Sequence, residues 1–164
     1  MNKITHKLRP FLPTDTNPLR DLFAQSIEEL TQDTYDEAQR AAWIEAAEDA
    51  AVFGKRLASG VTLVVHAGGQ YQGFATLKDN TLLDLIYVHP FAAGMGVGAT
   101  LLDALERIAT ARGSSTLAVD ASDTALPFFE HRGYVATQRN ARALGDVWLS
   151  NTTMKKQLAP KAQP

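Results

Sequence analysis

Three alternating glycines are the residues that most clearly point to chemistry. Gly94, Gly96 and Gly98 lie between an apolar run that ends at Val88 and a segment with helical periodicity. Glycine permits left-handed backbone angles and lets a ligand approach the backbone closely. Free amides at the start of a helix attract anions, and the helix dipole adds to that attraction. The loop therefore predicts a phosphate or pyrophosphate site, and a glycine-rich helix entry without a ligand is the structural alternative.

Two common phosphate-binding motifs fit this loop poorly. A Walker A loop needs Lys and then Ser or Thr after its last glycine, and this sequence lacks that pair. A dinucleotide-binding fingerprint matches Gly94, Gly96 and Ala99, with Asp120 near the expected distance. However, five residues separate Val88 from Gly94, where that fingerprint needs a tight turn. A dinucleotide binder of the Rossmann type is therefore the less favoured alternative.

Two aspartates are candidate catalytic bases. Asp84 interrupts the apolar run Leu82–Ile86, where a carboxylate is costly unless it is paired or used. In a regular strand, residues 84, 86 and 88 share one face, so Asp84 is expected beside Val88. Asp120 follows the next short apolar run and is the second candidate. A salt-bridged Asp84 and a helix-capping Asp120 are the structural alternatives.

Four further polar and aromatic residues are candidates for binding a substrate. Tyr35, Gln39 and Trp43 recur at a spacing of four, which places them on one face of a helix. Trp148, in a late apolar segment, is expected to close the same pocket. Packing in the core is the alternative for the aromatic residues.

Composition limits the classes of function. The 164 residues carry a net charge of −2 and no cysteine, which excludes a disulfide framework, a thiolate metal site and a cysteine nucleophile. The basic and acidic residues are nearly balanced, so the sequence shows no excess of positive charge of the kind that binds nucleic acid. The four histidines have no metal-ligand spacing, so no metal is predicted. No apolar run is long enough for a membrane span and no leader pattern opens the chain, so we expect a cytoplasmic protein without a membrane partner.

The elements that position these residues follow from periodicity and turn signals. A first helix is expected to begin at Pro18. A second helix is expected over 36–50, preceded by a capping box of Thr34 and Glu37. A loop or helical turn over 54–60 follows it. Later helices run from the glycine loop to Gly113 and over 125–132. Strands are expected over 3–12, 61–67, 71–77, 81–88, 116–119, 134–139 and 147–154, with a frayed tail over 155–164. Because the three strands before the glycine loop form an antiparallel meander, this order predicts a mixed α/β or α+β fold.

Two separated motifs resemble the GNAT N-acetyltransferase superfamily. The family pattern Q/R-x-x-G-x-G/A after a strand ending in V-x-P is similar to Val88-His89-Pro90-x-x-Ala93-x-x-Gly96-x-Gly98. The family's A-x-x-apolar-Tyr-x-x-x-Gly-Phe helix is similar to Ala125-x-x-Phe128-Phe129-x-x-x-Gly133-Tyr134. The early Tyr, Gln and Trp also resemble an uncharacterised bacterial subgroup. The similarity spans nearly the whole chain and implies one domain over 1–158 and a flexible tail over 159–164.

The resemblance implies a GNAT-like fold and an acetyl-CoA site. Its mixed central sheet has helices on both faces, and its fourth and fifth strands splay to admit the pantetheine arm. That arm is expected to pair with the backbone of Ile86, Tyr87 and Val88. The pyrophosphate is expected on the loop residues Ala93, Gly94, Met95, Gly96, Val97, Gly98 and Ala99. Ser122 replaces a frequent Asn, and Ala125, Phe128 and Phe129 are expected to pack along the other side.

The sequence departs from the family pattern at two positions. Ala93 stands at the Q/R position, and Phe129 stands where a tyrosine often protonates the leaving thiolate. The implied reaction moves an acetyl group directly to a primary amine of a small molecule or protein, with a backbone amide near Val88 polarising the carbonyl. Because no cysteine can carry the acetyl group, transfer in one ternary complex is expected. A non-catalytic acyl-CoA-binding module is the alternative, and a homodimer through the late strands is compatible with the resemblance.

Overall fold

A seven-stranded mixed sheet forms the centre of the protein. The computed structural model describes residues 6–159. The strands lie in the order β1-β2-β3-β4-β5-β7-β6, and every neighbouring pair is antiparallel except β4 and β5. The antiparallel meander before the glycine loop is incompatible with a dinucleotide-binding fold, whose first strands are parallel. The strands are β1 (Leu8–Pro10), β2 (Val61–Ala67), β3 (Gln70–Lys78), β4 (Leu82–Val88), β5 (Thr116–Ser122), β6 (Val135–Leu144) and β7 (Val147–Gln157).

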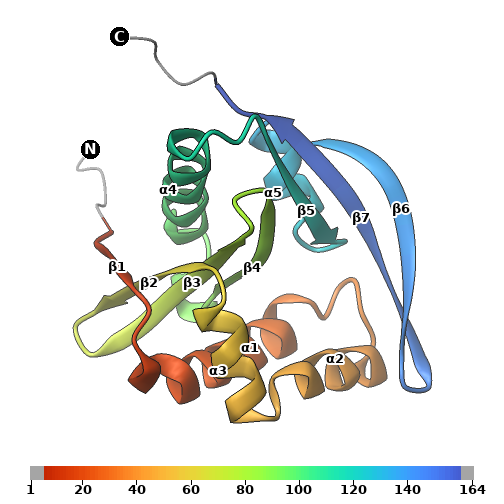
Figure 1. Ribbon diagram of the computed structural model, residues 1–164. Coiled ribbons are helices and arrows are strands. Elements are labelled where there is room, and N and C mark those ends of the chain that lie inside the picture. The colour runs from red at the N-terminus through yellow and green to blue at the C-terminus, as the bar shows by residue number, and fades with distance from the viewer. Residues whose placement is uncertain (1–5, 160–164) are drawn as a thin grey trace, which may run out of the picture.

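Helices cover both faces of the sheet (Figure 1). One apolar cluster packs under α4 (Val97–Ala111) and α5 (Leu126–His131), and the other packs under α1 (Thr16–Leu30) and α3 (Ala50–Ala58). The remaining helical elements are α2 (Glu37–Ile44), η1 (Pro13–Asp15), η2 (Glu45–Ala47) and η3 (Pro90–Ala92). The predicted mixed fold with helices on both faces is confirmed. Across residues 6–159, no helix has both the length and the apolar character that a membrane span requires.

The helical region after α1 differs from the prediction of one helix over 36–50. The chain ends α2 at Ile44 and begins α3 after Asp49, whose side chain accepts a hydrogen bond from Val52 N at 3.1 Å. A helix N-cap inside the periodic run therefore divides it in two. Of the segment 54–60, predicted as a loop or helical turn, residues 54–58 form the second half of α3, and Ser59 and Gly60 follow the helix. The predicted capping box of Thr34 and Glu37 is also wrong, because Asp36 and Gln39 form it two residues further on.

Long-range pairing extends two strands beyond their predicted ends. Ser122 lies opposite Asn151, so β5 continues past Val119 instead of ending there. At the other end Thr116 pairs with Gln157, which places 155–157 in β7 and not in a frayed tail. The first strand spans only Leu8–Pro10; its predicted residues 3–5 and the tail over 160–164 lie outside the described residues.

Two irregularities of β4 shape the site. Leu83 pairs with Leu77 and Leu85 pairs with Thr76, so Asp84 is the extra residue of a β-bulge. On its other edge, β4 pairs with β5 only at Leu82 and Leu83, although both strands continue. The predicted splay between the fourth and fifth strands is therefore present.

Candidate active site

A cleft of about 790 Å³ opens where β4 and β5 diverge. We call it the splay cleft. Every predicted cofactor-binding residue except Met95 lines it. These residues are Ile86, Tyr87, Val88, Ala93, Gly94, Gly96, Val97, Gly98, Ala99, Ser122, Ala125, Phe128 and Phe129. The volume lies within the range of small-molecule and cofactor sites.

The edge of β4 offers backbone groups to the splay cleft. His89 N donates to Gln72 O at 2.8 Å, so the amide of His89 points towards β3. Backbone groups alternate between the two edges of a strand, so the amides and carbonyls of Ile86 and Val88 point into the splay. Tyr87 lies opposite Phe74 and directs its backbone groups to β3. Two of the three residues expected to pair with an extended ligand therefore have the orientation to do so.

The glycine loop presents unpaired amides at the start of α4. Gly94 and Gly96 have φ angles of 77° and 84°, which residues with a side chain adopt only at a cost. Thr100 N donates to Gly96 O at 3.0 Å and is the first amide of α4 with a backbone acceptor. Among the described residues, the amides from Gly96 to Ala99 have none. This arrangement of free amides at a helix N-terminus is suited to an anion.

Aromatic side chains of α5 form the apolar wall of the cleft. Phe128 and Phe129 pack edge to face, with ring centroids 5.1 Å apart. Phe129 is 1% exposed and has no group that can donate a proton. A Cβ on Gly98 would lie 3.5 Å from the Phe128 ring and 3.6 Å from Val88, so the glycine keeps this end of the cleft wide.

Arg132 and His131 also line the splay cleft and were missed by the sequence analysis. The Arg132 guanidinium lies 5.7 Å from the centroid of the Phe128 ring and 3.4 Å from an oxygen of Asp103. A basic side chain in the last turn of the predicted 125–132 helix was the available signal. Arg132 gives the cleft a cation, whereas Ala93 contributes no charge from the loop.

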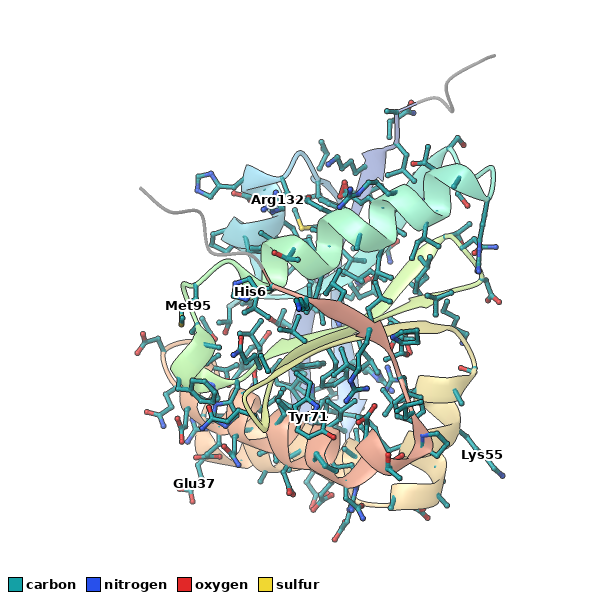
Figure 2. All side chains as sticks on the ribbon, turned by 90° about the vertical axis from the view of Figure 1, so that its left-hand side faces the viewer. His6, Glu37, Lys55, Tyr71, Met95 and Arg132 are labelled. Carbon is teal, nitrogen blue, oxygen red and sulfur yellow. The ribbon has the colours of Figure 1, made fainter. Side chains whose placement is uncertain are left out.

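Met95 lies at the outer side of the glycine loop. Its side chain is 42% exposed, and its carbonyl oxygen accepts a hydrogen bond from His6 Nε2 at 2.8 Å. Figure 2 shows His6 and Met95 on these neighbouring segments. The Met95 amide donates to Ala92 O at 3.3 Å, so both backbone groups of Met95 are already hydrogen-bonded within the protein.

A second cavity of about 380 Å³ lies between the helical layer and the β6–β7 hairpin. We call it the hairpin cavity. Figure 1 shows the hairpin extending beyond β5 towards α2, which β7 contacts. Tyr35, Trp43 and Tyr87 form an aromatic wall, and the opposite wall carries polar side chains that include Asn140 and Asn151. The cavity thus combines an apolar surface with several hydrogen-bonding groups, as ligand sites do.

The four predicted substrate-binding residues have different positions. Trp43 lines both cavities, and Tyr35 lines the hairpin cavity. The Tyr35 hydroxyl is already used, because it donates to Ser150 O at 2.7 Å and accepts from Asp123 N at 2.9 Å. Gln39 instead caps α2 and donates to Trp148 O at 2.8 Å. The Trp148 side chain is 63% exposed and lines neither cavity.

Asp84 forms an ion pair with Arg56 of α3. Arg56 Nε lies 2.8 Å from Asp84 Oδ2, and its Nη2 lies 3.0 Å from Oδ1. Hydrogen bonding to Asp84 raises the pKa of Arg56. The expectation that Asp84 shares a face with Ile86 and Val88 is wrong, because the bulge turns the Asp84 side chain towards α3.

Asp120 has a different environment. It lies within β5 rather than at its end, and Thr153 Oγ1 donates to its Oδ1 at 2.6 Å. Asn140 Nδ2 in turn donates to Thr153 Oγ1 and to Asn151 Oδ1, both at 2.8 Å. Within residues 6–159, Asp120 forms no ion pair. Thr153 was missed by the sequence analysis because its proximity depends on the β5–β7 pairing.

The two cavities meet at a shared wall, which we call the junction. Both catalytic candidates, Asp84 and Asp120, lie there, with Tyr87 and Ser122 beside them. Burial raises the pKa of Tyr87 to about 12, so its phenol stays protonated at neutral pH. The residues lining both cavities are Trp43, Leu83, Asp84, Leu85, Tyr87, Asp120 and Ser122. Groups bound in the two cavities would therefore meet beside a carboxylate. In the described part of the chain, no three His, Asp or Glu side chains are grouped to hold a metal.

Comparison with known proteins adds family evidence to this geometry. The family described as "Acetyltransferase (GNAT) domain" matches residues 31–158. The uncharacterized N-acetyltransferase YafP of Escherichia coli K12 is 28% identical over 155 residues, covering 94% of this chain and 97% of that protein. A crystal structure of a GCN5-related N-acetyltransferase from Rhodopseudomonas palustris is 49% identical, with a TM-score of 0.93, covering 96% and 99% of the two chains.

A more distant structure shares the fold. The PaiA N-acetyltransferase of Thermoplasma acidophilum, solved in complex with coenzyme A, is 17% identical with a TM-score of 0.78. The alignment covers 94% of this chain and 99% of that one.

Proposed function

The chain belongs to the GNAT acetyltransferase family, and from that premise we propose that it transfers an acetyl group from acetyl-CoA to a primary amine in one ternary complex. The observation that carries this proposal is the junction between the splay cleft and the hairpin cavity. The splay cleft accepts acetyl-CoA, and the hairpin cavity accepts the amine. The two reactants then meet beside Asp120 without a covalent enzyme intermediate.

The chain's own groups match the parts of acetyl-CoA in order along the splay cleft. The amides from Gly96 to Ala99 suit the pyrophosphate, and Arg132 lies at the same cleft as a further cation. The free edge of β4 at Ile86 and Val88 suits the amides of the pantetheine arm. Phe128 and Phe129 give the arm an apolar wall.

Asp120 is the group we propose as the base. Acetyl-CoA supplies an activated acetyl group: the amine nitrogen bonds to its carbonyl carbon, the carbon–sulfur bond breaks, and sulfur keeps the electron pair. Asp120 takes the first proton that the arriving ammonium must lose, directly or through one water. The nitrogen loses its second proton to water as the tetrahedral intermediate collapses to the amide and the thiolate. Thr153 occupies one carboxylate oxygen and leaves Oδ2 for the amine. Asp84, the other candidate, has both oxygens hydrogen-bonded to Arg56 and forms a neutral pair in the wall.

The two remaining steps need little from side chains. The amide of Val88, which points into the splay, polarises the acetyl carbonyl by donating a hydrogen bond. Phe129 cannot protonate the departing sulfur, but a thiolate is a fair leaving group and departs without that help. The enzyme therefore works with Phe129 as a packing residue.

A non-catalytic acyl-CoA-binding module is the second candidate. Phe129 and Ala93, which lack the proton donor and the polar side chain of the family pattern, are the observations that favour it. It shares the splay cleft with the first proposal and differs only in turnover. Steady, amine-dependent release of CoA excludes it.

Isothermal titration with acetyl-CoA tests the part that both candidates share. We expect saturable binding that free CoA competes for and that NAD does not affect. A matched titration of the Gly96→Ala variant should show weaker binding, since the loop amides are then displaced. Absence of binding at millimolar acetyl-CoA would contradict the proposal.

A further inference from the structure

Four charged side chains line the hairpin cavity: Arg56, Asp84, Asp120 and Arg142. Arg56 and Asp84 neutralise each other through two hydrogen bonds. Among the residues that the structure describes, the Asp120 side chain accepts a hydrogen bond only from the neutral hydroxyl of Thr153. Arg142 is exposed, and within residues 6–159 it forms no ion pair and no side-chain hydrogen bond. The cavity therefore keeps one uncompensated negative charge and one uncompensated positive charge.

These two charges lie on the same face of the sheet. Asp120 pairs with Thr153 of β7, and Arg142 pairs with Leu149 of β7. Residues directly opposite in a sheet share a face, and so do Leu149 and Thr153, which are separated by an even number of positions. All four residues line the hairpin cavity. The carboxylate and the guanidinium are thus two ends of one surface.

The sheet register gives the separation between these ends. Leu149 and Thr153 are four residues apart, which is about 13 Å along a strand. Asp120 and Arg142 lie on opposite sides of β7, about 10 Å apart across the strands. Their Cα atoms are therefore about 16 Å apart, and the long arginine side chain shortens the gap between the charged groups. An α-amino acid, with adjacent charges, is too short to span it.

The surface between the two charges is apolar on its helical side, whereas on the sheet Asn140 and Asn151 lie between the two charges. Trp43 and Tyr35 pack edge to face with ring centroids 5.5 Å apart, and Leu144 and Leu149 lie towards the Arg142 end. A methylene chain or ring is the suitable middle part for a ligand there. The volume of about 380 Å³ is at the small end of the range for ligand sites.

We propose that the acceptor is a small primary amine with a carboxylate several methylenes or a ring away, its ammonium at Asp120 and its carboxylate at Arg142. This inference rests on the proposed function and specifies its substrate class. Arg142 is a specificity residue in this account, since it binds the end of the substrate that does not react. It should therefore change KM more than kcat.

Matched acceptors test the proposal through CoA release from acetyl-CoA. We expect kcat/KM for ε-aminocaproate to be about tenfold or more above the value for either of two other amines. Hexylamine has the same chain length but no carboxylate, and glycine has a carboxylate but is too short. In Arg142→Gln the KM for ε-aminocaproate should rise until its advantage over hexylamine is lost. The kcat/KM for hexylamine should stay within about twofold of the wild-type value. Arg142→Lys should restore part of the advantage.

Arg107→Gln is the matched control, because it removes one positive charge from the exposed surface of α4, away from both cavities. It should leave the ratio between the two acceptors unchanged. Equal rates for ε-aminocaproate and hexylamine in the wild type, or an equal loss of both in Arg142→Gln, would overturn the inference while leaving the proposed function intact.

A binding measurement separates this inference from the proposed function. Titration of ε-aminocaproate into the protein saturated with CoA should give heat that Arg142→Gln weakens by about tenfold. If no amine is acetylated, the proposed function fails, and this titration still decides whether Arg142 binds the carboxylate. No heat in the wild type would overturn the inference.

Discussion

At the scale of residues, Asp84 and Asp120 line the same junction but have different hydrogen-bond partners. Asp84 is held by the permanently charged Arg56, which makes the pair a neutral part of the wall. Asp120 is oriented by Thr153, and behind it by Asn140, through neutral hydrogen bonds. A carboxylate that is oriented but not neutralised is suited to accept a proton from an ammonium group.

Replacement of the proposed base is the first prediction. Asp120→Asn keeps the shape and the hydrogen bond from Thr153 but removes the proton acceptor, so kcat should fall about 10²-fold. The KM for acetyl-CoA should stay the same, because the groups proposed to hold acetyl-CoA are the loop amides and the edge of β4, and Asp120 belongs to neither. The measurement is initial-rate CoA release with a saturating amine.

Two comparisons separate a base from a structural residue. A weakly basic amine, already deprotonated at neutral pH, should recover much of the rate in Asp120→Asn. Asp146→Asn, at the exposed turn of the β6–β7 hairpin, should leave kcat unchanged. A full rate in Asp120→Asn with a strongly basic amine would show that Asp120 is not the base.

A second carboxylate, Asp15, has a role in stability. It is 1% exposed, and Arg9 lies 2.7 Å from Oδ2 and 2.9 Å from Oδ1. Hydrogen bonds from the Arg9 guanidinium, with Leu12 N and Tyr71 adding to them, lower the pKa of Asp15 to about 2. Figure 2 shows Tyr71 on the face of the molecule near the first strand. The folded state therefore favours the carboxylate over the protonated form.

This pKa shift predicts a pH dependence of unfolding. Because the folded pKa is depressed from 3.8, the stabilisation by Asp15 is complete above about pH 4 and is lost as the pH falls towards 2. The difference in unfolding free energy between the wild type and Asp15→Asn should therefore shrink by about 2 kcal/mol over that range. Urea unfolding at a series of pH values measures it. A difference that does not change with pH would contradict the role of the Arg9–Asp15 pair.

At the scale of elements, the start of α4 is the part that depends most on one residue type. Gly96 is the N-cap of α4 and has a left-handed backbone conformation. A Cβ built there meets no atom within 4 Å, so the cost of a side chain comes from the backbone and not from a clash. Any relief of that strain rotates the amides that form the anion site.

Gly96→Ala should destabilise the protein by about 1 kcal/mol and weaken CoA binding by about tenfold or more. Gly113→Ala is the matched control, because Gly113 has a φ of 91°, lies just after α4 and also has open space around it. It should show a similar loss of stability with unchanged CoA binding. Urea unfolding and titration calorimetry measure the two effects, and equal CoA affinity in both variants would contradict the role of the loop amides.

The elements also show how far the sequence could predict the site. The glycine loop, the helix after it and the meander before it follow from local patterns, and their positions agree with the prediction. The bulge at Asp84 depends on the register between β3 and β4, and no local pattern around Asp84 indicated it. The break between α2 and α3 was missed because the segment 36–50 has a continuous helical pattern. Asp49, within that segment, is nevertheless the N-cap at which α3 begins.

Contacts between distant segments were the other limit. Thr153 meets Asp120, and Arg142 lines the hairpin cavity, only because β7 lies between β5 and β6. That strand order is not visible in the spacing of either residue. The position of the glycine loop could be predicted from the sequence because its signal is local, whereas the polar wall opposite Trp43 depends on the assembled sheet.

At the scale of the whole molecule, two cavities that meet at one junction predict the order of events. In the proposed direct transfer both reactants are bound before the acetyl group moves, and the lack of cysteine in the sequence excludes an acetyl-cysteine intermediate. Initial rates measured at several concentrations of both substrates should therefore give intersecting double-reciprocal lines. Parallel lines would indicate a covalent acetyl-enzyme and would contradict direct transfer.

The most direct test of the account is amine-dependent release of free CoA thiol from acetyl-CoA, followed with a panel of primary amines. The account predicts steady multiple turnover with at least one amine, formation of an equal amount of acetylated amine by mass spectrometry, and a rate about 10²-fold lower in Asp120→Asn. Saturable binding of acetyl-CoA without amine-dependent turnover across the panel would contradict catalysis and leave only an acyl-CoA-binding module.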